Sequence, residues 1–263
     1  MTPTADRADA GPGSPPALRL AINGRFLSRA PTGVDRFAGE LVRALDEMLA
    51  AARSRGSDGL PRVELLLPSG CRPPALAYIR ERSLAGAPSQ AWEQGTLLRG
   101  AAGSFLLNLC NTAPVFKRDQ LVVIHDAATR RVPEAYGAAF RAWYGVLLPV
   151  LGRTARCVAT VSEFSRREIA EAFAIPARKI AVLPEGAEHL HRVLPDRSIL
   201  QTHRLAGRPF LLAVSSVVAH KNFALIARAL QACPSGASFN VGLAGGSKPP
   251  VVGQAGLGPG PRV

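Results

Sequence analysis

Four short segments of the sequence hold polar residues that could bind a ligand or take part in catalysis, and each lies near the end of an apolar run. The candidates are Thr32 and Gly33 in the first segment, His125 and Asp126 in the second, Ser162 in the third, and Ser216, His220 and Lys221 in the fourth. Ligands of open α/β sheets bind outside the carboxyl ends of strands, so residues at such places are well positioned for binding.

The side chains in these segments favour a phosphate or sugar ligand. Gly33, at the start of a predicted helix, lets backbone N–H groups approach an anion. His125 can donate a hydrogen bond to a hydroxyl or stabilise developing charge, with Asp126 beside it. Lys221 opens a predicted helix, where a cation is unfavourable for the helix dipole unless an anion binds there. The sequence therefore predicts a diphosphate clamp at Lys221, with His220 as its partner.

Each candidate also has a purely structural alternative. Gly33 fits a tight turn, His125 a ring satisfied by nearby backbone, Ser162 a helix N-cap and Lys221 a solvated surface side chain. A hydrolase built on Ser162, His125 and Asp126 is disfavoured, because the sequence has no G-x-S-x-G motif and adjacent residues point apart. It also lacks G-x-G-x-x-G and the P-loop pattern, so an ordinary dinucleotide or P-loop site is not supported.

Strands alternate with helices along the chain, which predicts an α/β fold with a parallel sheet. The predicted strands are 18–23, 63–67, 105–108, 121–124, 157–161, 180–183, 209–214 and 239–243. The predicted helices are 34–53, 76–84, 134–151, one that starts at Ser162 and carries 166–173, and 222–231. Residues 92–103 are irregular or weakly helical by pattern. We expect a disordered tail at 1–16, a complete Rossmann-like domain at 17–186, a linker at 187–208, the start of a second Rossmann-like domain at 209–246 and an irregular tail at 247–263.

The composition limits the classes of protein. The 263 residues carry 32 Lys and Arg against 19 Asp and Glu, a net charge of +13. The cations are scattered rather than clustered, so a nucleic-acid partner is not expected, although a salt-sensitive basic binder remains an alternative. Four separated cysteines and the absence of a signal peptide favour a cytoplasmic protein. Contact with the inner face of a membrane through Arg141, Trp143 and Arg153 competes with packing of the same helix on the sheet.

Taken in order, several segments resemble the GT-B glycosyltransferases of family 4, which include mannosyltransferase-like enzymes that use nucleotide sugars. The segments are Asn23-Gly-Arg-Phe-Leu27, Thr32-Gly-Val34, Trp92-Glu-Gln94, Asn108-Leu-Cys-Asn-Thr-Ala-Pro114, Ile124-His-Asp126, Thr160-Val-Ser-Glu-Phe-Ser-Arg166, Pro184-Glu-Gly186 and Lys221-Asn222. The resemblance covers about 18–246 and implies two Rossmann-like domains facing across a cleft.

The resemblance also implies roles for the candidate residues. The N-terminal domain would bind a glycan or lipid-linked acceptor, with Thr32, Asp126 and Ser162 on that side. The second domain would bind a nucleotide-diphosphate sugar. His125 would contact the donor sugar. Gly33, Ser216, His220 and Lys221 would serve the diphosphate. Family members transfer a sugar, here mannose by analogy, with retention of configuration and without a bound metal or other cofactor.

Two features depart from the family pattern. The basic residue expected near Lys221 is replaced by His220 and Ser216. The family's Glu-x7-Glu motif should follow Gly246, yet no acidic residue follows Asp196. We therefore expect a C-terminally truncated form that is inactive by itself. The alternative is a non-catalytic fragment that binds the acceptor without turnover.

Overall fold

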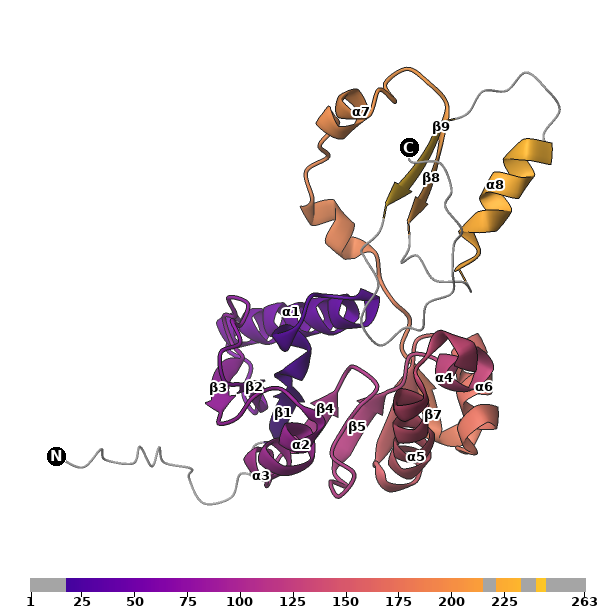
Figure 1. Ribbon diagram of the computed structural model, residues 1–263. Helices are drawn as coiled ribbons and strands as arrows, with labels where there is room; N and C mark the ends of the chain where they lie inside the picture. Colours follow the sequence, from indigo (N-terminus) through magenta and orange to yellow (C-terminus); the bar gives the residue numbers. More distant parts are fainter. Residues whose placement is uncertain (1–17, 215–220, 233–239, 245–263) are drawn as a thin grey trace.

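The computed structural model describes residues 18–214, 221–232 and 240–244 and arranges their strands in two parallel sheets (Figure 1). The larger sheet has seven strands in the order β3-β2-β1-β4-β5-β6-β7, and the smaller pairs β8 with β9. The strands are β1 Arg19–Asn23, β2 Arg62–Pro68, β3 Arg80–Leu84, β4 Phe105–Asn108, β5 Gln120–Val123, β6 Cys157–Thr160, β7 Ile180–Val182, β8 Phe210–Val214 and β9 Asn240–Ala244. This order, reversing between β1 and β4, is the doubly wound Rossmann arrangement.

Helices connect the parallel strands. The α-helices are α1 Gly33–Ser54, α2 Gln90–Trp92, α3 Leu98–Gly100, α4 Ala128–Arg131, α5 Ala138–Thr154, α6 Glu163–Phe173, α7 Ser198–Thr202 and α8 Phe223–Ala232. Short 3-10 segments lie at η1 Gly24–Ser28, η3 Pro133–Ala135, η4 Ala177–Lys179 and η5 Glu188–Arg192, and η2 Glu93–Leu97 is a π-helix. The predicted α/β fold with a parallel sheet flanked by helices is confirmed.

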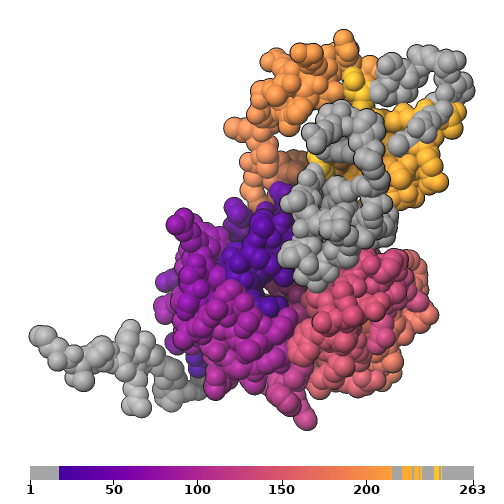
Figure 2. All heavy atoms as spheres, in the orientation of Figure 1, coloured from indigo at the N-terminus to yellow at the C-terminus, as the bar shows by residue number. Residues whose placement is uncertain are grey.

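Alternating strand residues pack into different hydrophobic clusters on the two faces of the large sheet. Ile22 of β1 and Leu65 of β2 pack with α1 residues such as Ala38 and Val42. On the other face, two clusters cover the two halves of the sheet. The cluster over β1, β2 and β4 contains Ala21, Leu66, Leu106, Trp92, Leu97 and Ala101, and the cluster over β5–β7 contains Val122, Ile124, Val158 and Ile180 with the apolar sides of α5 and α6. Figure 2 shows the two halves as one packed mass, with the indigo-to-purple residues beside the pink ones.

The helix predicted over 76–84 is wrong. The Asp46 carboxylate of α1 accepts hydrogen bonds from the backbone N–H groups of Ala77, Tyr78 and Ile79, at 2.7, 2.8 and 2.7 Å. These contacts hold the backbone of residues 77–79, and the chain continues directly into β3. Residues 80–84 pair with β2, so their backbone groups serve the sheet and not a helix. Burial alone would raise the pKa of Asp46, but these three hydrogen bonds outweigh it and lower the pKa.

The other predicted elements of the large sheet are found with small shifts of boundary. Residues 92–103, weakly helical by pattern, form a helical run from α2 through η2 to α3 that buries Trp92 and Glu93. The predicted helix over 134–151 begins later, because η3 and an extended Gly137 precede α5. Ser162 caps α6 as predicted, since its hydroxyl accepts from the backbone N–H of Ser165 at 3.0 Å.

Residues 183–209 lead from the large sheet to the second βαβ unit. Arg192 of η5 forms ion pairs with Glu40 and Glu47 of α1. The predicted strands at 209–214 and 239–243 and the helix at 222–231 correspond to β8, β9 and α8. The proposed domain boundaries remain predictions, and the tails at 1–16 and 247–263 lie outside the described residues.

None of the helices in the described ranges is both long enough and apolar enough to cross a membrane. Arg141, Trp143 and Arg153 of α5 are all exposed, and their contact with a membrane surface remains a prediction.

Candidate functional site

A pocket of about 240 Å³ opens at the point where the strand order reverses, between the carboxyl ends of β1 and β4. We call it the switch-point pocket. It is lined by Asn23, Arg25, Phe26, Ser28, Arg29, Pro88, Glu93, Leu109, Cys110 and Thr112. Adjacent crossovers leave the sheet in opposite directions at such a point, which is where open α/β sheets bind their ligands.

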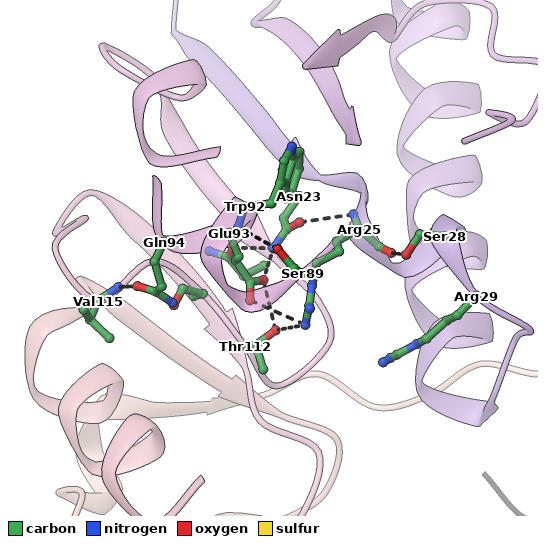
Figure 3. A network of polar contacts seen from close by, with 12 residues as sticks. Asn23, Arg25, Ser28, Arg29, Ser89, Trp92, Glu93, Gln94, Thr112 and Val115 are labelled. Atoms are coloured by element: carbon green, nitrogen blue, oxygen red, sulfur yellow. Dashed lines mark hydrogen bonds and ion pairs between the residues drawn. The ribbon is translucent and has the colours of Figure 1, made fainter. Parts of the chain in front are cut away.

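The wall of the pocket is a network of polar side chains around Glu93 (Figure 3). Asn23 Nδ2, at the end of β1, donates to Glu93 Oε1 at 2.6 Å and to Asn108 Oδ1, at the end of β4, at 3.1 Å. Thr112 Oγ1 donates to the same Glu93 oxygen at 2.9 Å and accepts from Arg25 Nη2 at 3.0 Å. The network therefore ties both strand ends to the helical run that follows β3.

Glu93 is the buried acid of this network. Its side chain is 0% exposed and lies 3.5 Å from the Arg25 guanidinium, which is 19% exposed. Burial raises the pKa of Glu93, although Arg25, Asn23 and Thr112 act in the opposite direction. Its direct partners hold the carboxylate inside the wall, while the Arg25 head group reaches the pocket in a fixed orientation.

A second arginine on the pocket is held by a second buried acid. The Arg29 guanidinium donates to Asp35 Oδ1 through Nη2 at 2.6 Å and through Nε at 3.0 Å. Asp35 Oδ2 accepts from both the backbone N–H and the hydroxyl of Thr32, at 2.9 and 2.6 Å. Thr32 and Gly33, two of the predicted residues, thus start α1 beside the pocket, and a Cβ built on Gly33 would meet open space.

Cys110 contributes an inert thiol to the pocket. Its pKa is raised to about 12, chiefly by burial and then by the nearby Asp35, whose effect exceeds the opposing effect of Arg29. The thiol therefore stays protonated at neutral pH and is a poor nucleophile.

His125 follows β5 and is 6% exposed. Its Nε2 lies 2.9 Å from the carbonyl oxygen of Leu109. A carbonyl oxygen only accepts, so Nε2 carries a proton, and in the neutral ring Nδ1 keeps a lone pair. The ring packs edge-on against Phe37 with centroids 4.9 Å apart, and Nδ1 lies 3.9 Å from Glu185 Oε1.

The backbone of His125 is tied to the same loop as its ring. Its N–H donates to Asn111 Oδ1 at 2.8 Å. Asn111 lies in the left-handed region at φ 64°, which asparagine tolerates better than most residues. Through Leu109 and Asn111, His125 is therefore joined to the loop that lines the switch-point pocket.

Asp126 and Ser162 lie apart from this network. Asp126 is exposed, and its Oδ1 accepts from the backbone N–H of Ala128 at 2.9 Å. Ser162 caps α6 and donates to the Ser165 hydroxyl at 3.1 Å. In this structure both side chains fix the start of a helical turn, and the contacts of Ser162 are those of its alternative role as a helix N-cap.

The fourth predicted segment is described only in part. Lys221 is exposed and comes two residues before Phe223, the first residue of α8. Ser216 and His220 lie outside the described residues, so the predicted diphosphate clamp stays a prediction.

The residues that form the pocket wall were absent from the predicted site. Arg25, Glu93, Asn108 and Thr112 stand inside segments that carry the family resemblance, but no functional role was assigned to them. Asn23 and Asn108 could be identified as candidates from the sequence, because each is an amide residue at the end of an apolar strand. Glu93 could not, because its burial depends on Trp92 and Leu97 packing against the sheet.

The comparisons with known proteins show the fold. No family model and no curated protein matches the sequence. Eleven chains of solved structures match it. One of them is Anabaena HepE in complex with UDP and glucose, at 15% sequence identity and a TM-score of 0.51 over 86% of this chain. The match spans 61% of the HepE chain, about three fifths of its length.

Proposed function

We propose that the chain is a glycosyltransferase of the GT-B type, related to family 4, which acts on a nucleotide-diphosphate sugar and a glycan or lipid-linked acceptor. The observation that carries this proposal is the fold match over 86% of the chain to a protein that holds UDP and glucose. The pocket at the switch point of the complete sheet and the second parallel βαβ unit support the same proposal.

In this proposal the acceptor binds in the switch-point pocket. Arg25 and Arg29 are each compensated by a buried acid, so the pocket offers fixed hydrogen-bond donors with little net charge. Such a lining suits a hydroxyl-rich sugar better than a strongly charged group, because donors that are already oriented lose little freedom when they bind. Thr32 lies beside this site. Asp126 and Ser162 would serve the acceptor only if their helix-starting contacts were exchanged for contacts with the ligand.

The donor sugar is proposed to contact His125. The Leu109 carbonyl fixes the tautomer of the ring, so Nδ1 can accept a hydrogen bond from a sugar hydroxyl. Lys221, with Ser216, His220 and the Gly33 backbone, is proposed to neutralise the leaving diphosphate. That charge grows as the glycosidic bond to the nucleotide breaks, and cations and helix N-termini can stabilise it without a metal ion. Retention of configuration belongs to the same proposal.

The sugar and the cellular setting are finer parts of the proposal. Family resemblance favours mannose, whereas HepE holds UDP and glucose, so both donors belong in the test. The proposed setting is the cytoplasm, with peripheral contact to the inner membrane face and no nucleic-acid partner. Binding of the acceptor without turnover is the competing proposal.

A transfer assay tests the proposed function. The chain is incubated with radiolabelled UDP-glucose or GDP-mannose and an array of glycans and lipid-linked saccharides, and the label on each acceptor is counted. Transfer to at least one acceptor class, reduced about 100-fold in His125→Ala and in Lys221→Gln, would establish the proposed activity and contradict the inactivity predicted from the missing Glu-x7-Glu motif. Arg178→Gln, an exposed arginine on η4, is the matched charge control and should keep the rate. Acceptor binding with no transfer from either donor supports the non-catalytic alternative instead.

A further inference from the structure

A second hollow, of about 510 Å³, lies at the opposite edge of the large sheet from the switch-point pocket. We call it the amino-edge hollow, because Arg19, Arg62 and Arg80 on its wall are the first residues of β1, β2 and β3. The C-terminal turn of α1 closes one side with Arg53. The remaining lining residues are Leu20, Ser57, Leu60, Val63, Glu64, Tyr78 and Ser104.

Four arginines line this hollow, and none of them pairs with an acid in the part of the chain that the structure describes. Arg19 and Arg62 are register partners on adjacent parallel strands, so their side chains leave the sheet on the same face. Within the described ranges, neither they nor Arg53 and Arg80 form an ion pair. The one acid of the lining, Glu64, is already paired with Arg82 at 3.1 Å. The hollow therefore carries an uncompensated charge contributed by four separate elements.

The wall that presents these charges is held in place. Asp46 fixes the backbone of residues 77–79, directly before Arg80, and Tyr78 donates its hydroxyl to the Pro61 carbonyl at 2.9 Å, directly before Arg62. Strand pairing fixes Arg19 against Arg62. Three of the four arginines thus start from rigid backbone, so the hollow does not have to be assembled when a ligand arrives.

We propose that the amino-edge hollow binds a phosphate-bearing molecule that carries two or more negative charges. Guanidinium groups match phosphate oxygens with paired N–H donors, and several of them around one cavity favour a multiply charged ligand. The Ser57 and Ser104 side chains on the wall add hydroxyl donors. A volume of about 510 Å³ accommodates a small molecule or a single head group.

This site is separate from the proposed glycosyl transfer. The two lining sets share no residue, and parallel strands keep their amino and carboxyl ends at opposite edges of the sheet. Loss of phosphate binding at the amino-edge hollow would leave the switch-point pocket intact, and the reverse also holds. The two proposals therefore fail independently.

Calorimetric titration of inorganic pyrophosphate into the full chain tests the proposal. We expect binding that weakens at least tenfold in Arg62→Gln/Arg80→Gln and in Arg19→Gln/Arg53→Gln. Arg167→Gln/Arg178→Gln removes the same charge from exposed positions on α6 and η4 and should bind as the unmodified chain does. Three results overturn the proposal: absence of binding, binding that stays unchanged in both arginine pairs of the hollow, and equal weakening in all three variants. Unchanged binding means that the anion binds elsewhere, such as at the proposed diphosphate clamp near Lys221, and equal weakening means that only the overall positive charge attracts it.

A vesicle arm identifies the source of the phosphate group. Flotation with vesicles containing phosphatidic acid is compared with flotation with neutral phosphatidylcholine vesicles. Binding of pyrophosphate alone, lost in Arg62→Gln/Arg80→Gln, identifies a free phosphorylated molecule. Additional binding to phosphatidic acid vesicles with the same arginine dependence identifies a lipid head group. Vesicle binding that is equal in the unmodified chain and in Arg62→Gln/Arg80→Gln counts against the hollow as the lipid site. Circular dichroism melting of each variant confirms that it is folded.

Discussion

The arginines at the two edges of the large sheet differ in whether a buried acid pairs with them. At the carboxyl edge, Arg25 and Arg29 are each held by an acid buried in the protein, Glu93 and Asp35. At the amino edge, four arginines share a hollow whose one acid is paired elsewhere. Arginine side chains therefore form a different kind of site at each edge of the sheet. Compensated arginines act as oriented hydrogen-bond donors, whereas uncompensated ones attract charge.

The largest expected loss of folding stability comes from replacing Glu93, the buried acid at the carboxyl edge of the sheet. Glu93→Ala leaves Arg25 without its counter-charge and takes the acceptor away from Asn23 and Thr112. Removing one partner of a buried ion pair typically costs about 3–5 kcal/mol. Urea denaturation should show this loss in the free energy of unfolding. A loss below about 1 kcal/mol would contradict the network described here.

Glu93→Gln separates charge from hydrogen bonding at the same position. The amide oxygen can still accept from Asn23 and Thr112, so a smaller loss is expected near neutral pH. Because burial raises the pKa of Glu93 in the folded state, its ionisation disfavours folding. The wild-type chain should therefore lose stability relative to Glu93→Gln as the pH rises from the unfolded pKa through the higher folded pKa. Denaturation series at several pH values measure this difference.

The second-largest loss of stability is expected at Asp46, which holds the backbone of residues 77–79 beside the amino-edge hollow. Asp46→Ala removes one acceptor from three backbone N–H groups at once, one of them fully buried, and should cost about 2–4 kcal/mol. Chemical denaturation again provides the measurement, with Asp58→Ala as a control at an exposed loop position. Equal stability of Asp46→Ala and the wild-type chain would contradict the role of Asp46 in holding the backbone before β3.

The contribution of Asp46 should also depend on pH. Its pKa is lowered in the folded state, so ionised Asp46 stabilises the fold above its unfolded pKa near 3.8. That contribution is lost as the pH falls through the still lower folded pKa. The stability difference between wild type and Asp46→Asn should therefore shrink as the pH falls from the unfolded pKa near 3.8 through the lower folded pKa. A difference that stays constant over this range would mean that charge plays no part.

The smallest effect distinguishes the two edges directly. Arg62→Gln/Arg80→Gln removes two mutually repelling charges that have no acid to lose, so stability should change by no more than about 0.5 kcal/mol. At low ionic strength the change should be in the stabilising direction, and added salt should abolish it. A clear loss of stability would show that these arginines have partners and would remove the contrast between the edges.

Much of the fold could be predicted from the sequence because buried parallel strands read as short apolar runs. Runs such as 105–108 and 121–124 identified β4 and β5 closely, and the spacing of Phe37, Leu41, Leu45 and Leu49 identified α1. The helix predicted over 76–84 is wrong because residues 80–84 pair with β2 and residues 77–79 are held by Asp46, a residue 31 positions or more away. Local pattern carries no information about a hydrogen bond from another element.

The site was predictable only in part, for the same reason. His125 and Gly33 stand at strand and helix ends, where the rule for open sheets places ligands. The structure links the His125 ring to Leu109 of the pocket and makes Gly33 the first residue of α1. Glu93 lies in a stretch without clear periodicity and reaches Asn23 across 70 residues of sequence. The placement of Arg19 beside Arg62 likewise follows from strand register, which the sequence alone does not reveal.

The most direct test of the account is saccharide binding at the switch-point pocket. Fluorescently labelled chain is applied to arrayed glycans and lipid-linked saccharides, beside Ser28→Trp, which fills the pocket, and Arg62→Gln/Arg80→Gln, which alters only the amino edge. We predict binding to at least one saccharide class, lost in Ser28→Trp and kept in the double arginine variant. Binding that survives Ser28→Trp, or no binding to any saccharide, would contradict the assignment of this pocket as the acceptor site.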